Sequence, residues 1–191
     1  MKTITFIRHG KSEANKKAVM SGHSQTNLSD EGRKELEQLK DEIHYPETDL
    51  IFSSDLPRAY DTAKFLYPNQ EIIKLKELRE TNFGSYEGRP VDEVIEEFYE
   101  LFLNNSAQDE METYETLKQR LSSIIESISK KMSEEQKKSA VIVAHNGVLR
   151  MVHHIYKQTP FDRYRDHYTK NGRGFSIIFD AYGQVLEIVD L

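Results

Sequence analysis

Residues 140–144 constrain the fold more than any other stretch of the chain. They read Ala-Val-Ile-Val-Ala, so both faces of a strand formed there would be apolar. A strand buried on both faces is typical of the centre of a parallel sheet that helices cover on each side. The run stops at His145-Asn146-Gly147, and a helical pattern follows. The segment therefore predicts an α/β fold with His145 at the carboxyl end of a central strand.

The beginning of the chain repeats this arrangement. Residues 3–7 form a short run of β-branched and aromatic residues, and Arg8, His9 and Gly10 follow it directly. Such a run, bounded by a glycine, predicts a buried strand. Ligands bind at the carboxyl ends of strands in open α/β sheets. Arg8 and His9 are therefore candidates for a functional site.

Helix and strand signals alternate along the rest of the chain. A helix is predicted to begin near Ser29, which is a good N-cap with two acids in the turn that follows. Residues 49–52 and 71–75 predict two more strands, and further helices are predicted after residue 55, from 90, over 114–132 and after 146. Residues 175–179 and 185–189 predict a terminal hairpin or paired edge strands.

Composition limits the class of protein. A chain of 191 residues fits one domain, residues 1–191, with a substantial core. Its net charge of −6 argues against a general nucleic-acid binder, and it has no cysteine for a disulfide, a thiolate metal site or a nucleophile. The first apolar run is too short for a signal peptide, and no stretch approaches a membrane span. The expected compartment is the cytoplasm.

Basic side chains follow three of the predicted strands. Arg8 and His9 follow the first, Arg58 lies one turn into the helix after the second, and His145 follows the buried strand. Because the ends of parallel strands share one edge of the sheet, these groups are expected to converge on an anion. Two guanidinium groups suit a dianionic phosphate, and the helix after Asn146 would add backbone donors. A carboxylate ligand is the alternative, although phosphate uses the donors better.

The other histidines have no such context. They are His23, His44, His153, His154 and His167. The adjacent pair at 153–154 would point about 100° apart on a helix, without a carboxylate at ligand spacing. No metal site is expected.

A set of motifs runs from residue 3 to about residue 150: Arg8-His9-Gly10, Asn15, Ser21-Gly22, Leu28-Ser29 with Gly32, Ser53-Ser54 with Arg58-Ala59 and Thr62-Ala63, Leu78 with Glu80, Gly84 and Glu87-Gly88, and Ala144-His145 with Gly147. In this order the motifs resemble the histidine phosphatase, or phosphoglycerate mutase-like, superfamily. The resemblance implies a three-layer α/β/α sandwich with a mostly parallel central sheet. It also implies phosphoryl transfer through a phosphohistidine, without a metal or another cofactor.

The resemblance also implies roles for individual residues. It makes His9 the nucleophile, Glu80 the proton donor, and Arg8, Arg58 and His145 the phosphate pocket. The substrate-binding rim would comprise Asn15, Ser21, Gly22, Asn146 and Gly147.

Physical chemistry supports these roles. A neutral imidazole nitrogen can attack phosphorus if the other ring nitrogen donates its proton to a fixed acceptor. Arginines spread the phosphoryl charge, and a protonated or donor-oriented His145 would add a third contact. The leaving oxygen needs a proton, and Glu80 lies in a loop punctuated by glycines. Two other carboxylates compete for this role, but Glu13 is too near His9 in sequence, and Glu87 is interpreted as a structural residue of the loop.

The segment from about 82 to 115 is predicted to form a cap over the pocket. The candidates to line or brace it are Phe83, Tyr86, Phe98, Tyr99 and Phe102, and ordinary core packing is the alternative for the last three. From Arg89 to Glu112, one base accompanies eight acids, so the cap is expected to hold a second anionic group of a substrate poorly. After Glu80 the chain reads Thr-Asn-Phe-Gly, where the mutase branch carries further basic groups. Lys11 and Gln25 also depart from the family pattern.

These features together predict a cytoplasmic, metal-independent phosphomonoester phosphatase that acts on a small phosphorylated metabolite. No nucleic acid or membrane partner is expected, and the protein would be a monomer or a homodimer. One alternative is a phosphoglycerate mutase, which the loop after Glu80 disfavours. A non-catalytic module that binds a phosphorylated ligand is a further alternative, disfavoured because both His9 and Glu80 are present.

Overall fold

A six-stranded sheet forms the centre of the protein. A computed structural model describes residues 1–191, with the strand order β3-β2-β4-β1-β5-β6. The strands are β1 (Lys2–Arg8), β2 (Leu50–Ser54), β3 (Ile72–Leu75), β4 (Ser139–Ala144), β5 (Gly174–Phe179) and β6 (Val185–Asp190). The first four are mutually parallel, whereas β5 runs antiparallel to β1 and β6 antiparallel to β5. The prediction of a mostly parallel sheet with a terminal hairpin is confirmed.

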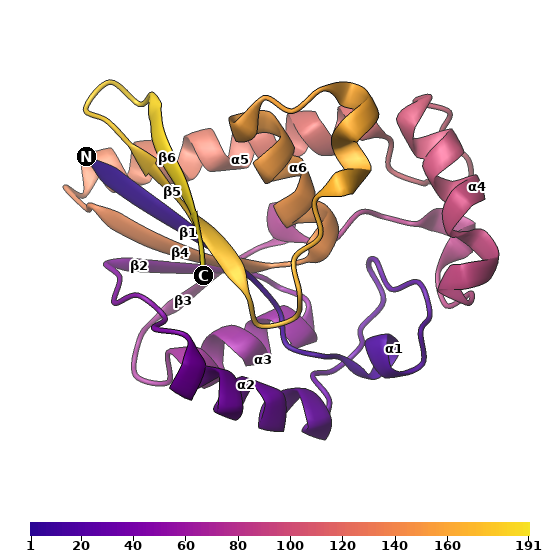
Figure 1. Ribbon diagram of the computed structural model, residues 1–191, viewed down its shortest axis with the longest axis horizontal. Helices are drawn as coiled ribbons and strands as arrows, with labels where there is room; N and C mark the ends of the chain where they lie inside the picture. Colours follow the sequence, from indigo (N-terminus) through magenta and orange to yellow (C-terminus); the bar gives the residue numbers. More distant parts are fainter.

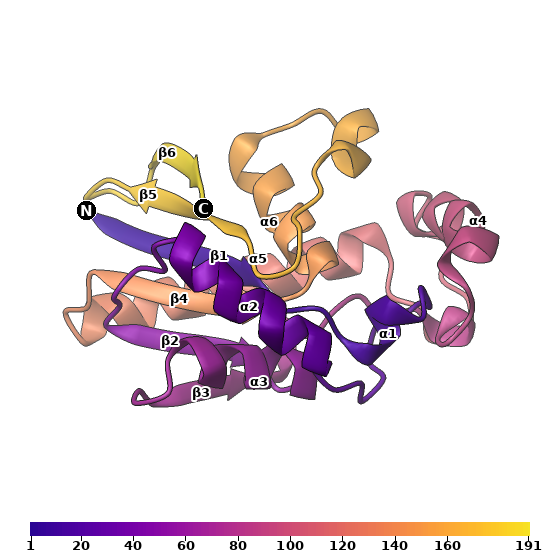
Figure 2. The ribbon, with the colours of Figure 1, turned by 60° about the horizontal axis from the view of Figure 1, so that its bottom comes forward.

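Helices cover both faces of this sheet (Figures 1 and 2). The helices α2 (Asp30–Glu42) and α3 (Pro57–Leu66) lie on one face, and α5 (Tyr114–Glu134) and α6 (Asn146–Lys157) lie on the other. Alternate residues of β4 enter different cores, because successive side chains of a strand point to opposite faces. Ile142 packs in the larger core with α5 and α6, while Val141 and Val143 pack against α3. These are the three layers of the predicted α/β/α sandwich.

Two of the helix starts have clear causes in the sequence. The hydroxyl of Ser29 accepts a hydrogen bond from the Gly32 N–H at 3.0 Å, so α2 begins where its N-cap predicts. Thr113 and Thr116 form a reciprocal cap at the start of α5. The helix predicted over 114–132 is α5, and its buried apolar stripe includes Leu117, Leu121, Ile125, Ile128 and Met132.

Short helical turns were not anticipated from the sequence. They are α1 (Glu13–Lys16) and the 3₁₀ turns η1 (Lys76–Leu78), η2 (Gly84–Tyr86) and η3 (Phe161–Asp166). A turn of three to six residues is too short to show an apolar period, so pattern reasoning assigns it to a loop. In α1 the start is nevertheless fixed, because Ser12 and Asn15 cap each other reciprocally.

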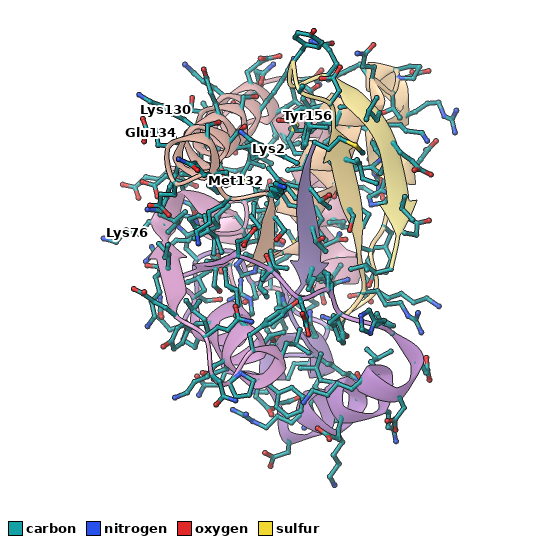
Figure 3. The ribbon with its side chains drawn as sticks, turned by 90° about the vertical axis from the view of Figure 1, so that its left-hand side faces the viewer. Lys2, Lys76, Lys130, Met132, Glu134 and Tyr156 are labelled. Carbon is teal, nitrogen blue, oxygen red and sulfur yellow. The ribbon has the colours of Figure 1, made fainter.

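The two ends of the sheet differ. Beyond the carboxyl ends of the parallel strands lie α1 and α4 (Val91–Leu103), and α4 stands away from the sheet (Figures 1 and 2). At the opposite end Lys2 lies beside the last turns of α5 (Figure 3), where its Nζ donates to the Ser129 carbonyl at 3.0 Å. A cation near a helix carboxyl terminus is favourable for the helix dipole. None of the helices has both the length and the apolar character needed to cross a membrane.

Candidate active site

A cavity of about 460 Å³ opens at the carboxyl ends of the parallel strands. Eight of the ten predicted site residues line it: Arg8, His9, Asn15, Ser21, Arg58, Glu80, Asn146 and Gly147. His145 lies directly behind His9, with the ring centroids 5.0 Å apart. Gly22 is not in the lining. The strand ends therefore converge as the sequence predicts.

His9 is held as a neutral nucleophile would need to be. Its side chain is buried, and Nδ1 lies 2.7 Å from the Gly10 carbonyl oxygen. Because a carbonyl can only accept, this contact places the ring proton on Nδ1 and leaves the lone pair on Nε2. Burial, together with the guanidinium groups of Arg58 and Arg8, holds the pKa of His9 well below its usual value. The imidazole is therefore neutral at physiological pH.

His145 is completely buried, and neither of its ring nitrogens has a partner in the protein. Burial, followed by the charge of Arg58, keeps the pKa of His145 well below its usual value. The sequence left open a protonated His145, and the structure instead favours the neutral ring. A buried donor without a partner costs about 1–3 kcal/mol. An oxygen of a bound phosphoryl group would satisfy it.

Arg8 is also buried without a carboxylate partner. Its Nη1 donates to the Thr169 carbonyl at 2.7 Å, and its guanidinium carbon lies 5.1 Å from the centroid of the Tyr168 ring. The Nε of Arg8 is buried and has no hydrogen-bond partner. Arg8 therefore presents a positive charge and a free donor at the base of the cavity.

Arg58 lines the cavity and also holds a loop of the site in place. Its two terminal nitrogens donate to four oxygens of the 21–26 loop: Ser21 O at 3.0 Å, Gly22 O at 2.7 Å, Ser24 O at 2.9 Å and Thr26 Oγ1 at 3.3 Å. Burial lowers the pKa of Arg58 to about 10, so it stays charged at neutral pH. The sequence interpretation gave both arginine forks to phosphate. In the structure the terminal donors of Arg58 hold the loop, which leaves Nε for a ligand.

Gly22 has a structural role in the same loop. Its N–H donates to Glu87 Oε1 at 2.9 Å, and its carbonyl accepts from Arg58. A Cβ at this position would lie 2.2 Å from the Thr81 carbonyl oxygen, so only glycine allows the approach. Both backbone groups of Gly22 are therefore engaged by protein partners, and its contact with substrate stays a prediction. Glu87 is structural, as the sequence interpretation had it.

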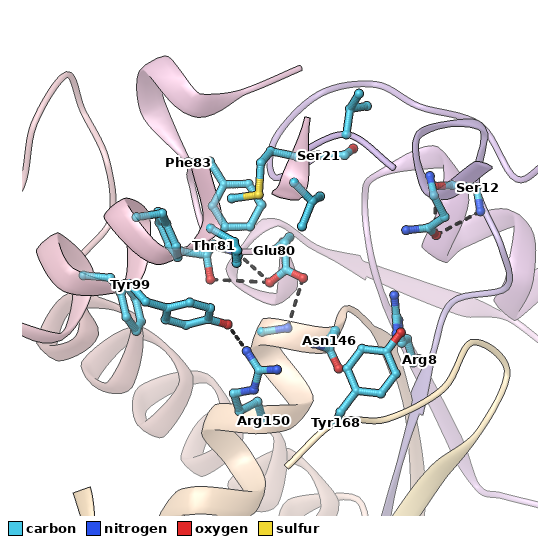
Figure 4. Close-up of a pocket in the computed structure, with 18 of the residues that line it drawn as sticks. Arg8, Ser12, Ser21, Glu80, Thr81, Phe83, Tyr99, Asn146, Arg150 and Tyr168 are labelled. Atoms are coloured by element: carbon cyan, nitrogen blue, oxygen red, sulfur yellow. Dashed lines mark hydrogen bonds between the residues drawn. The ribbon is translucent and has the colours of Figure 1, made fainter. Parts of the chain in front are cut away.

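Both carboxylate oxygens of Glu80 are fixed by backbone donors. Oε1 accepts from the Thr81 N–H at 2.8 Å and Oε2 from the Gly147 N–H at 3.0 Å (Figure 4). A Cβ at Gly147 would lie 2.2 Å from Oε1 of Glu80. The start of α6 therefore orients the predicted acid, and the Gly147 N–H is taken by Glu80.

The remaining rim residues are held by neighbouring polar groups. Asn15 Oδ1 accepts from the Ser12 N–H at 3.1 Å, and the Ser21 hydroxyl lies 2.8 Å from that of Ser24. Asn146 Oδ1 accepts from the Thr169 N–H at 3.2 Å. All three predicted residues lie on the cavity wall.

A third buried arginine was missed by sequence reasoning. Arg150 on α6 lines the cavity; its Nε donates to the His167 carbonyl at 2.8 Å and its Nη1 bonds to the Tyr99 hydroxyl (Figure 4). It forms no ion pair, whereas Arg165, also in the lining, is paired with Glu96 through two bonds of 2.6 and 2.7 Å. The sequence-based expectation of poor binding of a second anionic group counted charges only along residues 89–112, and Arg150 adds a cation to the cavity from outside that segment. Arg150 lies one helical turn after Asn146, and that spacing was the available signal.

The aromatic side chains of the predicted cap segment line the cavity or pack in the core. Phe83, Phe98, Tyr99 and Phe102 all lie in its lining, and the Phe98 and Phe102 rings stack with centroids 5.4 Å apart. Tyr86 is buried outside the lining and its hydroxyl donates to Glu97 at 2.9 Å. The sequence left open whether Phe98, Tyr99 and Phe102 line the pocket or pack in the core, and in the structure they do both.

Known proteins resemble this chain in sequence and in architecture. The chain is 30% identical over 154 residues to the adenosylcobalamin/alpha-ribazole phosphatase of Escherichia coli K12, covering 78% of this chain and 76% of the relative. It is 29% identical to a metal-independent phosphoserine phosphatase of Arabidopsis thaliana, covering 78% and 66%. A phosphoglycerate mutase structure from Bacillus anthracis superposes with a TM-score of 0.83 at 19% identity, covering 100% and 92%.

The predictions of fold class and of a phosphatase enzyme are confirmed by these likenesses. The profile of one family, the histidine phosphatase superfamily (branch 1), matches residues 4–190, almost the whole chain. The chain belongs to the histidine phosphatase superfamily, branch 1.

Proposed function

We propose that this phosphatase hydrolyses phosphomonoesters of small metabolites through a phosphohistidine formed on His9. The observation that carries the proposal is the contact between His9 Nδ1 and the Gly10 carbonyl, which leaves Nε2 as the attacking atom. Arg8, the Nε of Arg58 and the unpartnered ring of His145 are the groups that would hold the phosphoryl oxygens. Charge developing in transfer is then met by donors that are already in place.

The reaction would proceed in two steps. In the first, Nε2 of His9 bonds to phosphorus while the ester P–O bond breaks, and protonated Glu80 gives its proton to the leaving oxygen. In the second, the oxygen of a water molecule bonds to phosphorus as the P–N bond breaks, and Glu80 takes a proton from that water. This step releases inorganic phosphate and returns His9 to its neutral form. The proposed chemistry uses the side chains of this protein alone, without a metal or an organic cofactor.

Arg150 supports a substrate that carries a second anionic group, such as a carboxylate. A buried arginine without a carboxylate partner is costly unless a ligand brings the opposite charge. One terminal nitrogen of Arg150 has no protein partner, and the cavity volume suits a small metabolite. A phosphoserine-like ester has both charges within one small molecule, in keeping with the phosphoserine phosphatase among the relatives.

Phosphate release from a panel of esters tests the proposal. Phosphoserine, glycerol phosphate and p-nitrophenyl phosphate should all be hydrolysed, in the presence of EDTA as well, and vanadate should inhibit. Brief reaction with ³²P-labelled ester should leave an acid-labile, base-stable label on the wild-type protein and none on His9→Ala. Full loss of activity on chelation, restored by a divalent metal, would contradict the proposed mechanism.

Phosphoglycerate mutase activity is the second candidate, and Arg150 is the observation that favours it. A mutase must hold its phosphoglycerate through a second anionic group while the phosphohistidine persists. We expect clear phosphate release and little interconversion of 3- and 2-phosphoglycerate, even with 2,3-bisphosphoglycerate as primer. Interconversion much faster than phosphate release from any ester would replace the phosphatase proposal with the mutase.

We infer a cytoplasmic enzyme, since the chain lacks cysteine, and one whose partners are small phosphorylated metabolites and not nucleic acids, since its net charge is −6. We infer further that residues 1–191 act as one domain with residues 82–115 as its cap, in a monomer or a homodimer.

A further inference from the structure

Arg120 on α5 lies outside the cavity, yet every one of its donors is used. Its Nε and Nη2 donate to the two carboxylate oxygens of Glu112, at 2.7 and 2.6 Å. Nη1 donates to the carbonyls of Glu77 at 2.6 Å and Arg79 at 2.9 Å, and Nη2 also reaches the Glu80 carbonyl at 3.4 Å. A guanidinium group has five N–H donors, and Arg120 has five acceptors.

The three carbonyls belong to the short segment that carries the proposed acid. Residues 77–80 connect the end of η1 to Glu80, and the Glu80 carbonyl lies 3.1 Å from His23 Nε2 as well. The neighbouring Arg79 side chain is tied to Asp55 by two bonds, at 2.7 and 2.6 Å. The backbone up to and including the acid is therefore held by the side chains of Arg120 and His23, neither of which lines the cavity.

The part of α5 that carries Arg120 is packed firmly into the core. Leu117 and Leu121, close to Arg120 on α5, are completely buried in the larger core. Glu112, the ion-pair partner, lies next to the N-cap of α5, and its N–H donates to the Asn82 carbonyl at 2.9 Å. Arg120 thus links a helix of the core, the end of the cap segment and the backbone of the acid.

We infer that Arg120 is a positioning residue for the proton donor, which it holds through the backbone of residues 77–80. The inference depends on the proposed function, in which Glu80 protonates the leaving oxygen. A lysine could not replace the arginine, because an ammonium has three donors on one atom and cannot bridge a carboxylate and three carbonyls. In the first step a displaced acid would slow only those substrates whose leaving oxygen needs its proton, whereas the second step, hydrolysis of the phosphohistidine, is the same for all substrates. The first step is isolated by kcat/KM, which covers the reaction only up to release of the leaving group.

The test compares leaving groups in Arg120→Lys. With phosphoserine, kcat/KM should fall by about 10- to 100-fold, within the range expected of general acid catalysis. With p-nitrophenyl phosphate, whose leaving group needs little protonation, kcat/KM should fall by no more than about 3-fold. The inhibition constant of inorganic phosphate should change little, because Arg120 does not line the cavity. Glu112→Gln should give the same pattern with a smaller loss, and provides the second variant if Arg120→Lys unfolds.

Two controls separate this inference from the proposal on which it depends. Arg33→Lys alters a surface ion pair with Asp61 (3.7 Å), outside the cavity lining, and should leave both substrates unaffected. Glu80→Gln should show the leaving-group dependence itself. If Glu80→Gln shows it and the Arg120 and Glu112 variants lose both substrates equally or neither, the inference is overturned and the proposed function stands. If Glu80→Gln loses both substrates equally, Glu80 is not the proton donor, and both proposals fail.

Discussion

The two ends of the cavity are built in different ways. At the phosphoryl end, β1 and β4 are parallel neighbours, and Arg8 lies in register with Ala144. His9 and His145 are the next residues of the two strands, so sheet pairing alone brings them together. At the far end the wall consists of Tyr99 from α4 and Arg150 from α6, which no strand pairing relates.

We expect this difference to separate the residues that carry out the reaction from those that select the substrate. Residues at paired strand ends have little freedom, since hydrogen bonding in the sheet fixes their separation. The far wall depends on where α4 and the segment of residues 167–169 pack. That segment holds both ends, because the Thr169 carbonyl accepts from Arg8 and the His167 carbonyl from Arg150. We expect substitutions at the strand ends to abolish turnover and those at the far wall to change substrate preference.

His9→Ala should have the largest effect. Loss of the attacking nitrogen should reduce kcat by about 10⁴-fold or more for every ester, because the other groups cannot form the covalent intermediate. The fold should survive, since His9 is a polar residue at a strand end. Steady-state kinetics together with a thermal unfolding curve check both statements. Unchanged turnover in a folded variant would remove His9 from the centre of the mechanism.

Glu80→Gln should come next. With alkyl esters kcat/KM should fall by on the order of 10²–10⁴-fold, because the amide cannot supply a proton to the leaving oxygen. The loss in kcat/KM should shrink with p-nitrophenyl phosphate. Parallel measurements of kcat/KM for the two leaving groups give the ratio of the losses, and a ratio near one would argue against proton donation by Glu80.

Arg150→Met should affect substrate binding at the far end of the cavity and leave the other end unchanged. Loss of a charged hydrogen bond of about 1.5–3 kcal/mol corresponds to a rise in KM of roughly 10- to 100-fold for phosphoserine. The KM for p-nitrophenyl phosphate, which has no second anionic group, should change only a few-fold. The ratio of the two KM values is the measurement. Equal changes for both substrates would show that Arg150 supports the wall without binding a second anion.

The smallest expected effect is a loss of folding stability in acid, which arises near the far end of the cavity. The rings of His153 and His167 stack with centroids 3.8 Å apart. Burial, and then the neighbouring His153, lowers the pKa of His167 to about 4, although Asp190 opposes the shift. Burial and Lys157 lower the pKa of His153. The unfolded chain takes up these protons near its ordinary pKa of about 6.5, so stability is complete above that pH and decreases as the pH falls from there towards 4.

Thermal unfolding between pH 7.5 and 4.5 measures this loss. His167→Gln should flatten the dependence, because the substituted side chain does not titrate. An unchanged slope in the variant would assign the acid sensitivity to other groups. Because the His167 carbonyl holds Arg150, the KM for phosphoserine should rise over the same pH range more than that for p-nitrophenyl phosphate.

Local patterns determined the framework of this protein. The wholly apolar run at 140–144 predicted the central strand, because only a strand covered on both faces is apolar at every position. The helical pattern of residues 114–132 predicted the longest helix, and the N-cap at Ser29 predicted where α2 begins. The convergence of His9 and His145 followed from their places at the ends of parallel strands.

Only the tertiary structure decided how the side chains of the site are used. The terminal donors of Arg58 hold the 21–26 loop, the Gly147 N–H holds Glu80, and Arg150 enters the cavity from a helix far from the cap in sequence. Each of these contacts joins a side chain to a segment tens of residues away, often to its backbone, and such contacts leave no periodic or compositional trace in either segment. Strand and helix patterns arise from neighbours along the chain, so they could be predicted, whereas these contacts exist only after the layers have packed.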